Sequence, residues 1–344
     1  MAITKLNPLK RKIFNLFTHS LQNSKRVEQL KKLPKDSNIK VLISRPNHRL
    51  GNQLLLTPLI EEVKKQFPNC KIHLVVNGNL SFILFSQDNY IEKIINLPKK
   101  PFNNLFNYIA SSVKLMSNKY DIAIAGCENS NSSKIFVKLS RAKFKIYNSG
   151  TIVLDKPVHI AKHPIYNLKT VLNPGENLRD YNYSKLSIEL TNEEIEKGNL
   201  LLKELFNNSN KKVICIFTFA TGNKCHSKEW WATFYKNLEI EFNDFNILEM
   251  LPFENVSQID FKSTYFYSRD LREIASIIEN CLIFIGADSG MMHLSASTNT
   301  TTIGLFNKDN YDMYSPYGNN NQSIDTNTIQ INEIIKIIKK QLLA

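Results

Sequence analysis

The sequence predicts an α/β protein made of two doubly wound domains with a cleft between them. Short apolar runs alternate with helical patterns along most of the chain, which is typical of parallel sheets covered by helices on both faces. The alternation stops within residues 150–190, where several Pro, Gly and Asn residues occur, and then begins again. A length of 344 residues is sufficient for two domains.

The first alternating series predicts a domain over residues 38–165. Its predicted strands are the apolar runs at 39–44, 71–76, 93–97, 120–126 and 143–147. Its predicted helices lie near 51–67, 79–87, 104–117 and 131–140. Pro58 falls inside the first of these helices, and we expect it to kink the helix or delay its start.

The second series predicts a domain over residues 191–330, after an interdomain connection at 166–190. Its first helix opens with Thr191 and with Glu194 three residues later, a capping-box pattern. The predicted strands are 212–219, 246–250, 263–267, 282–287 and 301–306. Further helices are predicted near 228–242, 270–280 and 290–298, and a last helix in the C-terminal segment 331–344.

The composition indicates a globular protein of the cytoplasm. Hydrophobic residues make up 42% and charged residues 22% of the chain. No apolar run approaches the ~18 residues that a transmembrane helix needs. The cysteines are scattered without CxxC spacing, which is typical of reduced thiols and makes a metal site improbable: Cys70, Cys127, Cys215, Cys225 and Cys281.

The N-terminal segment, residues 1–37, is a basic amphipathic extension. Residues 1–35 hold nine Lys or Arg residues and one Glu, a large share of the chain's formal charge of +13. Apolar residues recur among them at roughly helical spacing, so the segment can lie on an anionic membrane surface. The alternative is that the apolar stripe packs on the domain behind it. We do not expect nucleic-acid binding, because no known module appears.

The most specific candidate site is IGADSGMMHLSAST, residues 285–298. A predicted strand ends in Asp288-Ser289-Gly290, and a helix follows at once. Open α/β sheets bind ligands at such strand ends, and the first turn of the helix suits a phosphate. His293 lies in the same turn. In the alternative interpretation, Asp288 and Ser289 only cap the helix and His293 is a packing residue.

Two other strand ends carry candidate ligand groups. In FTFATGNKCHSKEWW, residues 217–231, hydroxyl groups and lysines in the loop suit a diphosphate, unless the loop is merely solvated. In EMLPFEN, residues 249–255, Glu249 or Glu254 can accept hydrogen bonds from ribose hydroxyls, although an exposed carboxylate is the more common outcome.

Together these stretches resemble glycosyltransferase family 9, the bacterial heptosyltransferases of the lipopolysaccharide inner core. The resemblance spans most of residues 38–310. It depends on four stretches: RLGNQLLLTPLIEEVKKQFPNCKIHLVV, FATGNKCHSKEWW, LPFEN and, above all, FIGADSGMMHLSASTNTTTIGLF.

The resemblance implies a GT-B fold of two Rossmann-like domains, with the nucleotide-sugar donor on the C-terminal domain and the acceptor on the N-terminal one. It implies transfer of heptose from ADP-heptose to a lipid-linked or core oligosaccharide, with inversion, without a metal ion and without a cofactor. We expect the protein to be peripheral on the inner face of the cytoplasmic membrane.

The resemblance also implies roles for particular residues. Thr221 and Lys228 resemble the hydroxyl and lysine that hold the diphosphate, with Lys224 as a substitute for the lysine. The implied donor-binding set is Thr221, Lys224, Lys228, Glu254, Asp288, Ser289, Gly290 and His293. The predicted acceptor-binding set is Arg45, Arg49 and Gly51. The charges of the two arginines suit a phosphorylated or carboxylated sugar, unless they merely solvate a turn.

Asn52 occupies the place of the family's catalytic Asp. Inverting transfer needs a base for the proton of the acceptor hydroxyl, and an amide can only orient that hydroxyl. His48 and Glu128 are the candidate substitutes, and either can equally be a surface residue. Lys228 is expected to stabilise the leaving diphosphate. Two further functions remain open: a related glycosyltransferase with another nucleotide sugar or acceptor, and a catalytically weak nucleotide-sugar-binding paralogue.

Overall fold

The computed structural model describes residues 37–97, 115, 117–147 and 156–343 and shows two compact units. Of the described residues, the first unit takes in those within 37–48, 58–79 and 89–184. The second unit takes in Arg49–Thr57, Leu80–Asp88 and Lys185–Ala344. Two short segments from the first third of the sequence thus belong to the second unit. The continuous domain limits derived from the sequence stay a prediction.

The first unit is built on a parallel sheet with strand order β3-β2-β1-β4-β5. Its strands are β1 (Lys40–Ser44), β2 (Lys71–Asn77), β3 (Ile91–Leu97), β4 (Lys119–Ala125) and β5 (Arg141–Ile146). Its described helices include α4 (Thr57–Gln66), α7 (Asn131–Leu139) and α8 (Lys162–Leu172). All five predicted strands are present. The strand order reverses between β1 and β4, so their carboxyl ends mark the expected ligand position of this sheet.

Pro58 divides the helix that was predicted over residues 51–67. The structure has α3 (Leu50–Leu54) and then α4, in which Pro58 is the second residue. A proline is tolerated there because its missing N–H has no partner in the first turn. The predicted delay of the helix is therefore confirmed. The helix predicted near 104–117 and the extension at 1–35 lie largely or wholly outside the described residues.

The second unit is built on a larger parallel sheet with strand order β11-β10-β9-β6-β7-β8. Its strands are β6 (Val213–Phe217), β7 (Asn246–Met250), β8 (Thr264–Phe266), β9 (Ile283–Ala287), β10 (Thr301–Phe306) and β11 (Gln322–Asp325). Its described helices are α3, α5 (Leu80–Leu84), α9 (Asn192–Leu205), α10 (Lys228–Glu241), α11 (Leu271–Glu279), α12 (Gly290–Ala296), α13 (Tyr311–Tyr314) and α14 (Ile331–Leu343), with a 3₁₀ turn, η2 (Gly222–Lys224). The sequence did not predict α13 and β11.

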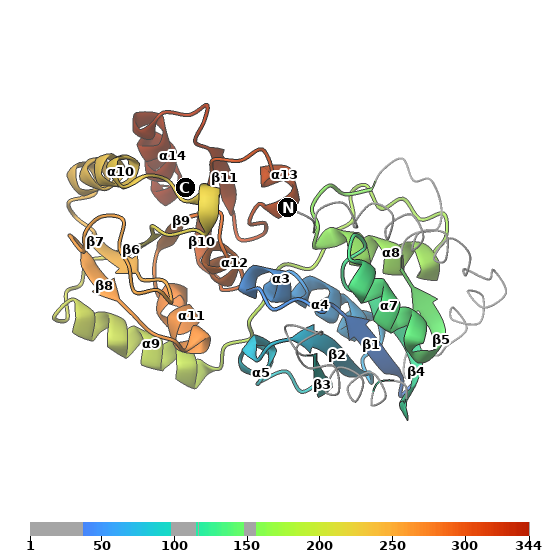
Figure 1. Cartoon of the computed structure of the whole chain (residues 1–344). Helices are drawn as coiled ribbons and strands as arrows, with labels where there is room; N and C mark the ends of the chain where they lie inside the picture. Colours follow the sequence, from blue (N-terminus) through green and yellow to red (C-terminus); the bar gives the residue numbers. More distant parts are fainter. Residues whose placement is uncertain (1–36, 98–114, 116, 148–155, 344) are drawn as a thin grey trace, which may run out of the picture. The chain divides into compact units, whose positions relative to one another are not determined.

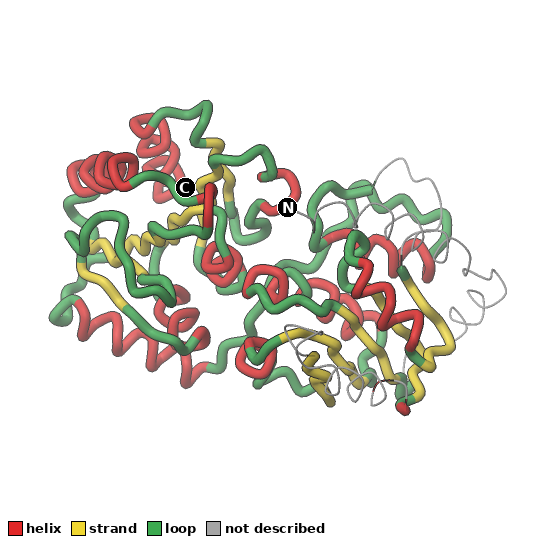
Figure 2. The backbone as a smooth tube through the Cα atoms, viewed as in Figure 1, coloured by secondary structure: helices red, strands yellow, loops and turns green. Residues whose placement is uncertain are grey.

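Helices cover both faces of this sheet, with α10 and α14 on one face and α9 and α11 on the other (Figures 1 and 2). Trp231 of α10 and Ile334 of α14 pack on Ile214 and Ile285 of the central strands, and all four side chains are fully buried. The doubly wound α/β prediction is confirmed for each unit. None of the described helices has the length and apolar content needed to cross a membrane.

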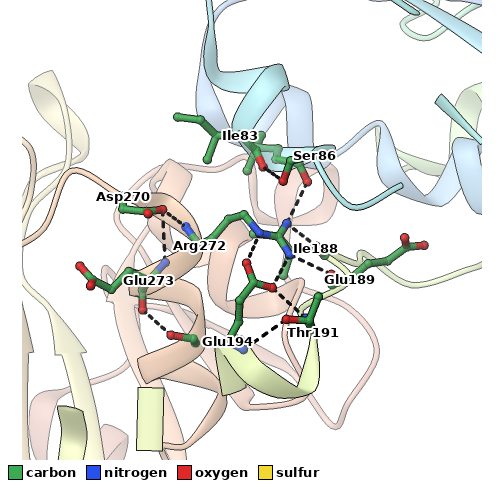
Figure 3. Close-up of polar contacts among 11 residues, drawn as sticks. Ile83, Ser86, Ile188, Glu189, Thr191, Glu194, Asp270, Arg272 and Glu273 are labelled. Carbon is green, nitrogen blue, oxygen red and sulfur yellow. Dashed lines mark hydrogen bonds and ion pairs between the residues drawn. The ribbon is translucent and has the colours of Figure 1, made fainter. Parts of the chain in front are cut away.

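Arg272 joins several segments of the second unit (Figure 3). Its guanidinium group is buried on α11 and is paired with the Glu194 carboxylate on α9. It also donates to the carbonyl oxygens of Leu84 at 3.4 Å, Ile188 at 3.1 Å and Glu189 at 2.9 Å. The hydrogen bonds from Arg272 hold the pKa of Glu194 below its usual range. One side chain therefore connects α11, α9, the end of α5 and the segment that leads into α9.

Replacing Glu194 by glutamine is expected to destabilise the protein by about 3 kcal/mol at pH 7. The glutamine can still accept the Thr191 N–H bond of the capping box, 2.8 Å long in the native chain, so the lost quantity is the charge opposite Arg272. Because the folded-state pKa of Glu194 is depressed, its stabilisation is present above the unfolded value, about 4.3, and is lost as the pH falls through the folded value.

Urea unfolding at pH 7 and at pH 3 checks this expectation. The difference between wild type and Glu194→Gln should shrink at the lower pH. Thr191→Ala is the control, because it removes the cap hydroxyl and leaves the ion pair, and it should lose only about 1 kcal/mol at both pH values. Equal destabilisation by Glu194→Gln at pH 3 and pH 7 would contradict the assignment.

Candidate functional site

The candidate site lies where the strand order of the second sheet reverses, between β6 and β9. The loop after β6 carries Lys224 and the loop after β9 carries Asp288, and the Lys224 Nζ lies 2.6 Å from the Asp288 Oδ2. The same carboxylate oxygen accepts a hydrogen bond from Asn310 Nδ2, 3.1 Å away, in the loop after β10. Carboxyl ends of three neighbouring strands thus contribute to one cluster, at the usual ligand position of such sheets.

Lys224 is the cation of this cluster. Its ammonium group lies 5.7 Å from the centre of the Tyr314 ring at the end of α13. Asp288 is almost fully buried, whereas the Lys224 side chain keeps 35% of its surface exposed. The buried carboxylate therefore holds the lysine in place, and the lysine remains accessible to an anionic ligand.

The segment that follows Asp288 forms the short helix α12. Ser289 is its N-cap residue, and the Ser289 hydroxyl accepts a hydrogen bond from the Met292 N–H at 3.4 Å. His293 is 4% exposed. The capping role considered for Ser289 is thus present, and binding of a donor by Ser289, Gly290 and His293 stays a prediction.

Among the described residues, three others predicted to bind the donor, Lys228, Thr221 and Glu254, make no hydrogen bond or ion pair with this cluster. Lys228 begins α10, and its Nζ pairs at 2.7 Å with Asp260, both side chains being largely exposed. That hydrogen bond raises the pKa of Lys228. Thr221 and Glu254 are exposed, and Thr221 precedes η2 without a side-chain cap bond. Of the two lysines considered from the sequence, the structure pairs Lys224 with the Asp288 block.

Glu249 is an internal residue of the second unit. It is fully buried at the end of β7, where its carboxyl group accepts hydrogen bonds from Thr218 Oγ1 at 2.6 Å and Ser257 Oγ at 2.7 Å. Burial raises the pKa of Glu249, and the two hydrogen bonds oppose this effect. Because both oxygens are engaged internally, Glu254 is the more accessible of the two acids considered for a ribose.

His226, in the loop after β6, is a packing residue. Its ring lies 4.2 Å from the ring of Trp230, and its Nε2 lies 2.8 Å from Thr326 Oγ1. Since the Thr326 hydroxyl donates to the carbonyl of Phe306, His226 Nε2 must be the donor to Thr326. Burial lowers the pKa of His226 to about 4, so the ring is neutral at physiological pH.

In the first unit, the residues predicted for the acceptor side have different surroundings. Arg45 is buried, and its Nη1 donates to the carbonyl of Gly126 at 2.8 Å, which joins the ends of β1 and β4. His48 is exposed. In the second unit, Arg49 is also exposed. An acceptor-binding role for Arg45 and Arg49 stays a prediction.

Glu128, the other candidate base, is engaged within the first unit. Its carboxylate accepts hydrogen bonds from Lys156 and from Asn167 Nδ2, the latter at 3.2 Å. Burial by itself raises the pKa of Glu128, but these hydrogen bonds outweigh it and the pKa is lowered. A carboxylate with a lowered pKa is a weaker base, so these contacts count against Glu128 as proton acceptor.

Gly51 and Asn52 lie in α3, which belongs to the second unit. A glycine that follows a strand often serves a tight turn. In the structure Gly51 is helical, and it is not among the described glycines with positive φ. A Cβ atom on Gly51 would lie 2.7 Å from His293 Cδ2 of α12. The contact between α3 and α12 joins residues that are far apart in the sequence, and no local pattern indicates it.

The comparisons with known proteins agree with this fold. A model of glycosyltransferase family 9 (heptosyltransferase) matches residues 268–337, which include Asp288 and α12. The comparison with curated proteins found no match.

Several solved structures share the architecture. The glycosyl transferase family 9 protein of Veillonella parvula DSM 2008 is 18% identical, with a TM-score of 0.70 over 90% of this chain and 98% of that one. E. coli heptosyltransferase WaaC with ADP is 15% identical, with a TM-score of 0.65 over 88% and 99%. E. coli ADP-heptose lps heptosyltransferase II is 14% identical, with a TM-score of 0.63 over 89% and 99%.

Two parallel, doubly wound sheets are the architecture of the GT-B glycosyltransferases that these solved structures represent. Structural likeness at these identities establishes the fold, and the family match is confined to residues 268–337. Over residues 268–337 the chain is similar to glycosyltransferase family 9, the heptosyltransferase family.

Proposed function

We propose that the protein transfers a heptose from ADP-heptose to a lipopolysaccharide or lipooligosaccharide core acceptor, with inversion at the anomeric carbon and without a metal ion. The observation that carries this proposal is the Lys224–Asp288 pair at the switch point of the second sheet, of which Asp288 lies within the segment that matches the family model. E. coli WaaC, which shares the fold, is known with ADP and with ADP-2-deoxy-2-fluoro heptose.

The chemistry of the leaving group supports the role of this pair. As the bond from the sugar to the diphosphate breaks, negative charge grows on the diphosphate oxygens, and a fixed cation stabilises that charge. Lys224 is a suitable cation because Asp288 and the Tyr314 ring hold its ammonium group in position while the side chain stays accessible. Lysine thereby supplies positive charge that other enzymes take from a metal ion.

The acceptor side of the reaction depends on Asn52. Its amide can accept a hydrogen bond from the acceptor hydroxyl and orient the oxygen, but it does not take up the proton. This residue supports a second candidate, a catalytically weak nucleotide-sugar-binding paralogue. A related glycosyltransferase with another nucleotide sugar or acceptor is the third.

Nucleotide binding and turnover test the proposal together. Calorimetry with the full chain should show binding of ADP and not of UDP. ADP-heptose and a truncated lipooligosaccharide in anionic vesicles should then give product, and deletion of residues 1–35 should lower turnover on vesicles without changing ADP affinity. Binding of UDP in place of ADP would contradict the proposal that ADP-heptose is the donor. ADP binding without turnover would favour the binding paralogue.

A further inference from the structure

Two glycines of the second unit meet where α3 packs against α12 (Figure 1). A Cβ atom on Gly51 would lie 2.7 Å from His293 Cδ2 and 3.5 Å from Gly290 Cα. A Cβ atom on Gly290 would lie 3.0 Å from Leu50 Cβ and 3.3 Å from the Gly51 nitrogen. The two helices therefore pack closely, and a side chain on either glycine would force a neighbouring atom to move.

The backbone itself does not require these glycines. Neither Gly51 nor Gly290 is among the described glycines with positive φ, and both lie in helices. Alanine is a better helix former than glycine by about 1 kcal/mol. An alanine at position 51 would thus be acceptable to the backbone, and the obstacle is the His293 ring.

The rest of α3 is also fixed to the second unit. Its last residue, Leu54, and the two leucines that follow are buried. Thr57 Oγ1 donates to the Leu54 carbonyl at 2.8 Å and accepts from the Ser187 N–H at 3.1 Å. The segment Arg49–Thr57 is therefore attached to the unit that carries the Asp288 cluster, although it follows β1 of the first unit in the sequence.

We infer that Gly51 is a positioning residue of the donor site. The absence of a side chain at position 51 leaves room for the His293 ring, and α3 carries Asn52 as part of the donor-binding unit. This inference rests on the proposed function, which makes α12 a donor-binding element. It differs from the expectation that Gly51 belongs to the acceptor side. Because α3 packs on α12 within the second unit, position 52 keeps a fixed place relative to residues 288–293.

The test is a double-mutant cycle between Gly51→Ala and His293→Ala, measured in the full-length protein by calorimetry with ADP. Gly51→Ala is expected to weaken ADP binding about tenfold or more, since overpacking of this size displaces the His293 ring. In the His293→Ala background the clash is absent, so Gly51→Ala should cause no further loss. A purely structural role would instead lower stability and leave ADP affinity unchanged.

Gly198→Ala is the matched control. A Cβ atom there would meet the Ser276 carbonyl oxygen at 2.3 Å, so the variant is overpacked within the same unit but away from the Asp288 cluster. It should lower the melting temperature without changing ADP affinity. If Gly51→Ala does not fold, Gly290→Ala replaces it, with Leu50→Gly as the relieving partner, because Leu50 Cβ and Cδ2 are among the atoms that a Cβ on residue 290 would meet.

The outcomes separate this inference from the proposed function. Unchanged ADP affinity in Gly51→Ala, or the same loss with and without the His293 ring, would overturn the inference while wild-type ADP binding still supports the function. If wild type binds no ADP, the proposed function fails and the donor-side role of Gly51 fails with it, even where thermal unfolding shows Gly51 and His293 to be coupled.

Discussion

Asn52→Asp is expected to increase the rate of heptose transfer by about 10²-fold. The carboxylate can accept the proton of the attacking hydroxyl, which the native amide does not. The gain should appear in kcat with ADP-heptose and a truncated lipooligosaccharide as substrates. It should decline at acidic pH as the new carboxyl group becomes protonated. ADP affinity should stay close to that of wild type, because the change replaces one planar side chain by another of the same size.

Asn52→Ala is the control for this experiment, since it removes the side chain without adding a base. It should be slower than wild type if the amide orients the acceptor. No turnover in wild type combined with turnover in Asn52→Asp would identify the native protein as a weak paralogue. A fast wild type that Asn52→Asp does not accelerate would contradict the prediction and place the base elsewhere, which His48→Ala and Glu128→Ala would then locate.

Lys224→Ala is expected to lower kcat by about 10²–10³-fold. The substitution removes the cation that lies 2.6 Å from Asp288 and leaves that buried carboxylate with Asn310 as a neutral partner. The site then presents negative charge to a negatively charged diphosphate. ADP affinity should fall with kcat, which calorimetry and initial rates measure on the same preparation.

Lys228→Ala is the matched control, because it removes a lysine from the same loop and helix start. Its ammonium group is paired with an exposed carboxylate, Asp260, at the surface. We expect this variant to keep most of its activity and ADP affinity. A larger loss in Lys228→Ala than in Lys224→Ala would show that Lys228 holds the diphosphate, as the resemblance to the family implies.

Local patterns predicted most of the fold. The apolar runs predicted the five strands of the first sheet and five of the six strands of the second, because central parallel strands are buried on both faces and must be apolar. The strand they did not predict, β11, has the sequence QSID and lies at the edge of its sheet, where polar residues are tolerated. Short-range signals such as Thr191 with Glu194 and Pro58 were also sufficient for the helix starts that they mark.

The end of β9 is recognisable in the sequence, so Asp288 is predicted to lie at a strand end without knowledge of its contacts. Binding of a donor there stays a prediction. The choice between Lys224 and Lys228 could not be made from the sequence, because it depends on how the loop after β6 folds toward the loop after β9. The hydrogen bonds from Lys156 and Asn167 to Glu128 could not be predicted either, because those partners lie 28 and 39 residues away in the sequence.

The sequence by itself determined the fold class, the order of strands and helices, the family resemblance and the residue at position 52. Only the tertiary structure decided which lysine pairs with Asp288, and that Gly51 and Asn52 belong to the unit that carries α12. The physical reason is the range of the interactions. Periodicity, caps and proline act between near neighbours in the chain, whereas the contact of Gly51 with His293 exists only because two distant helices pack closely enough to exclude a side chain.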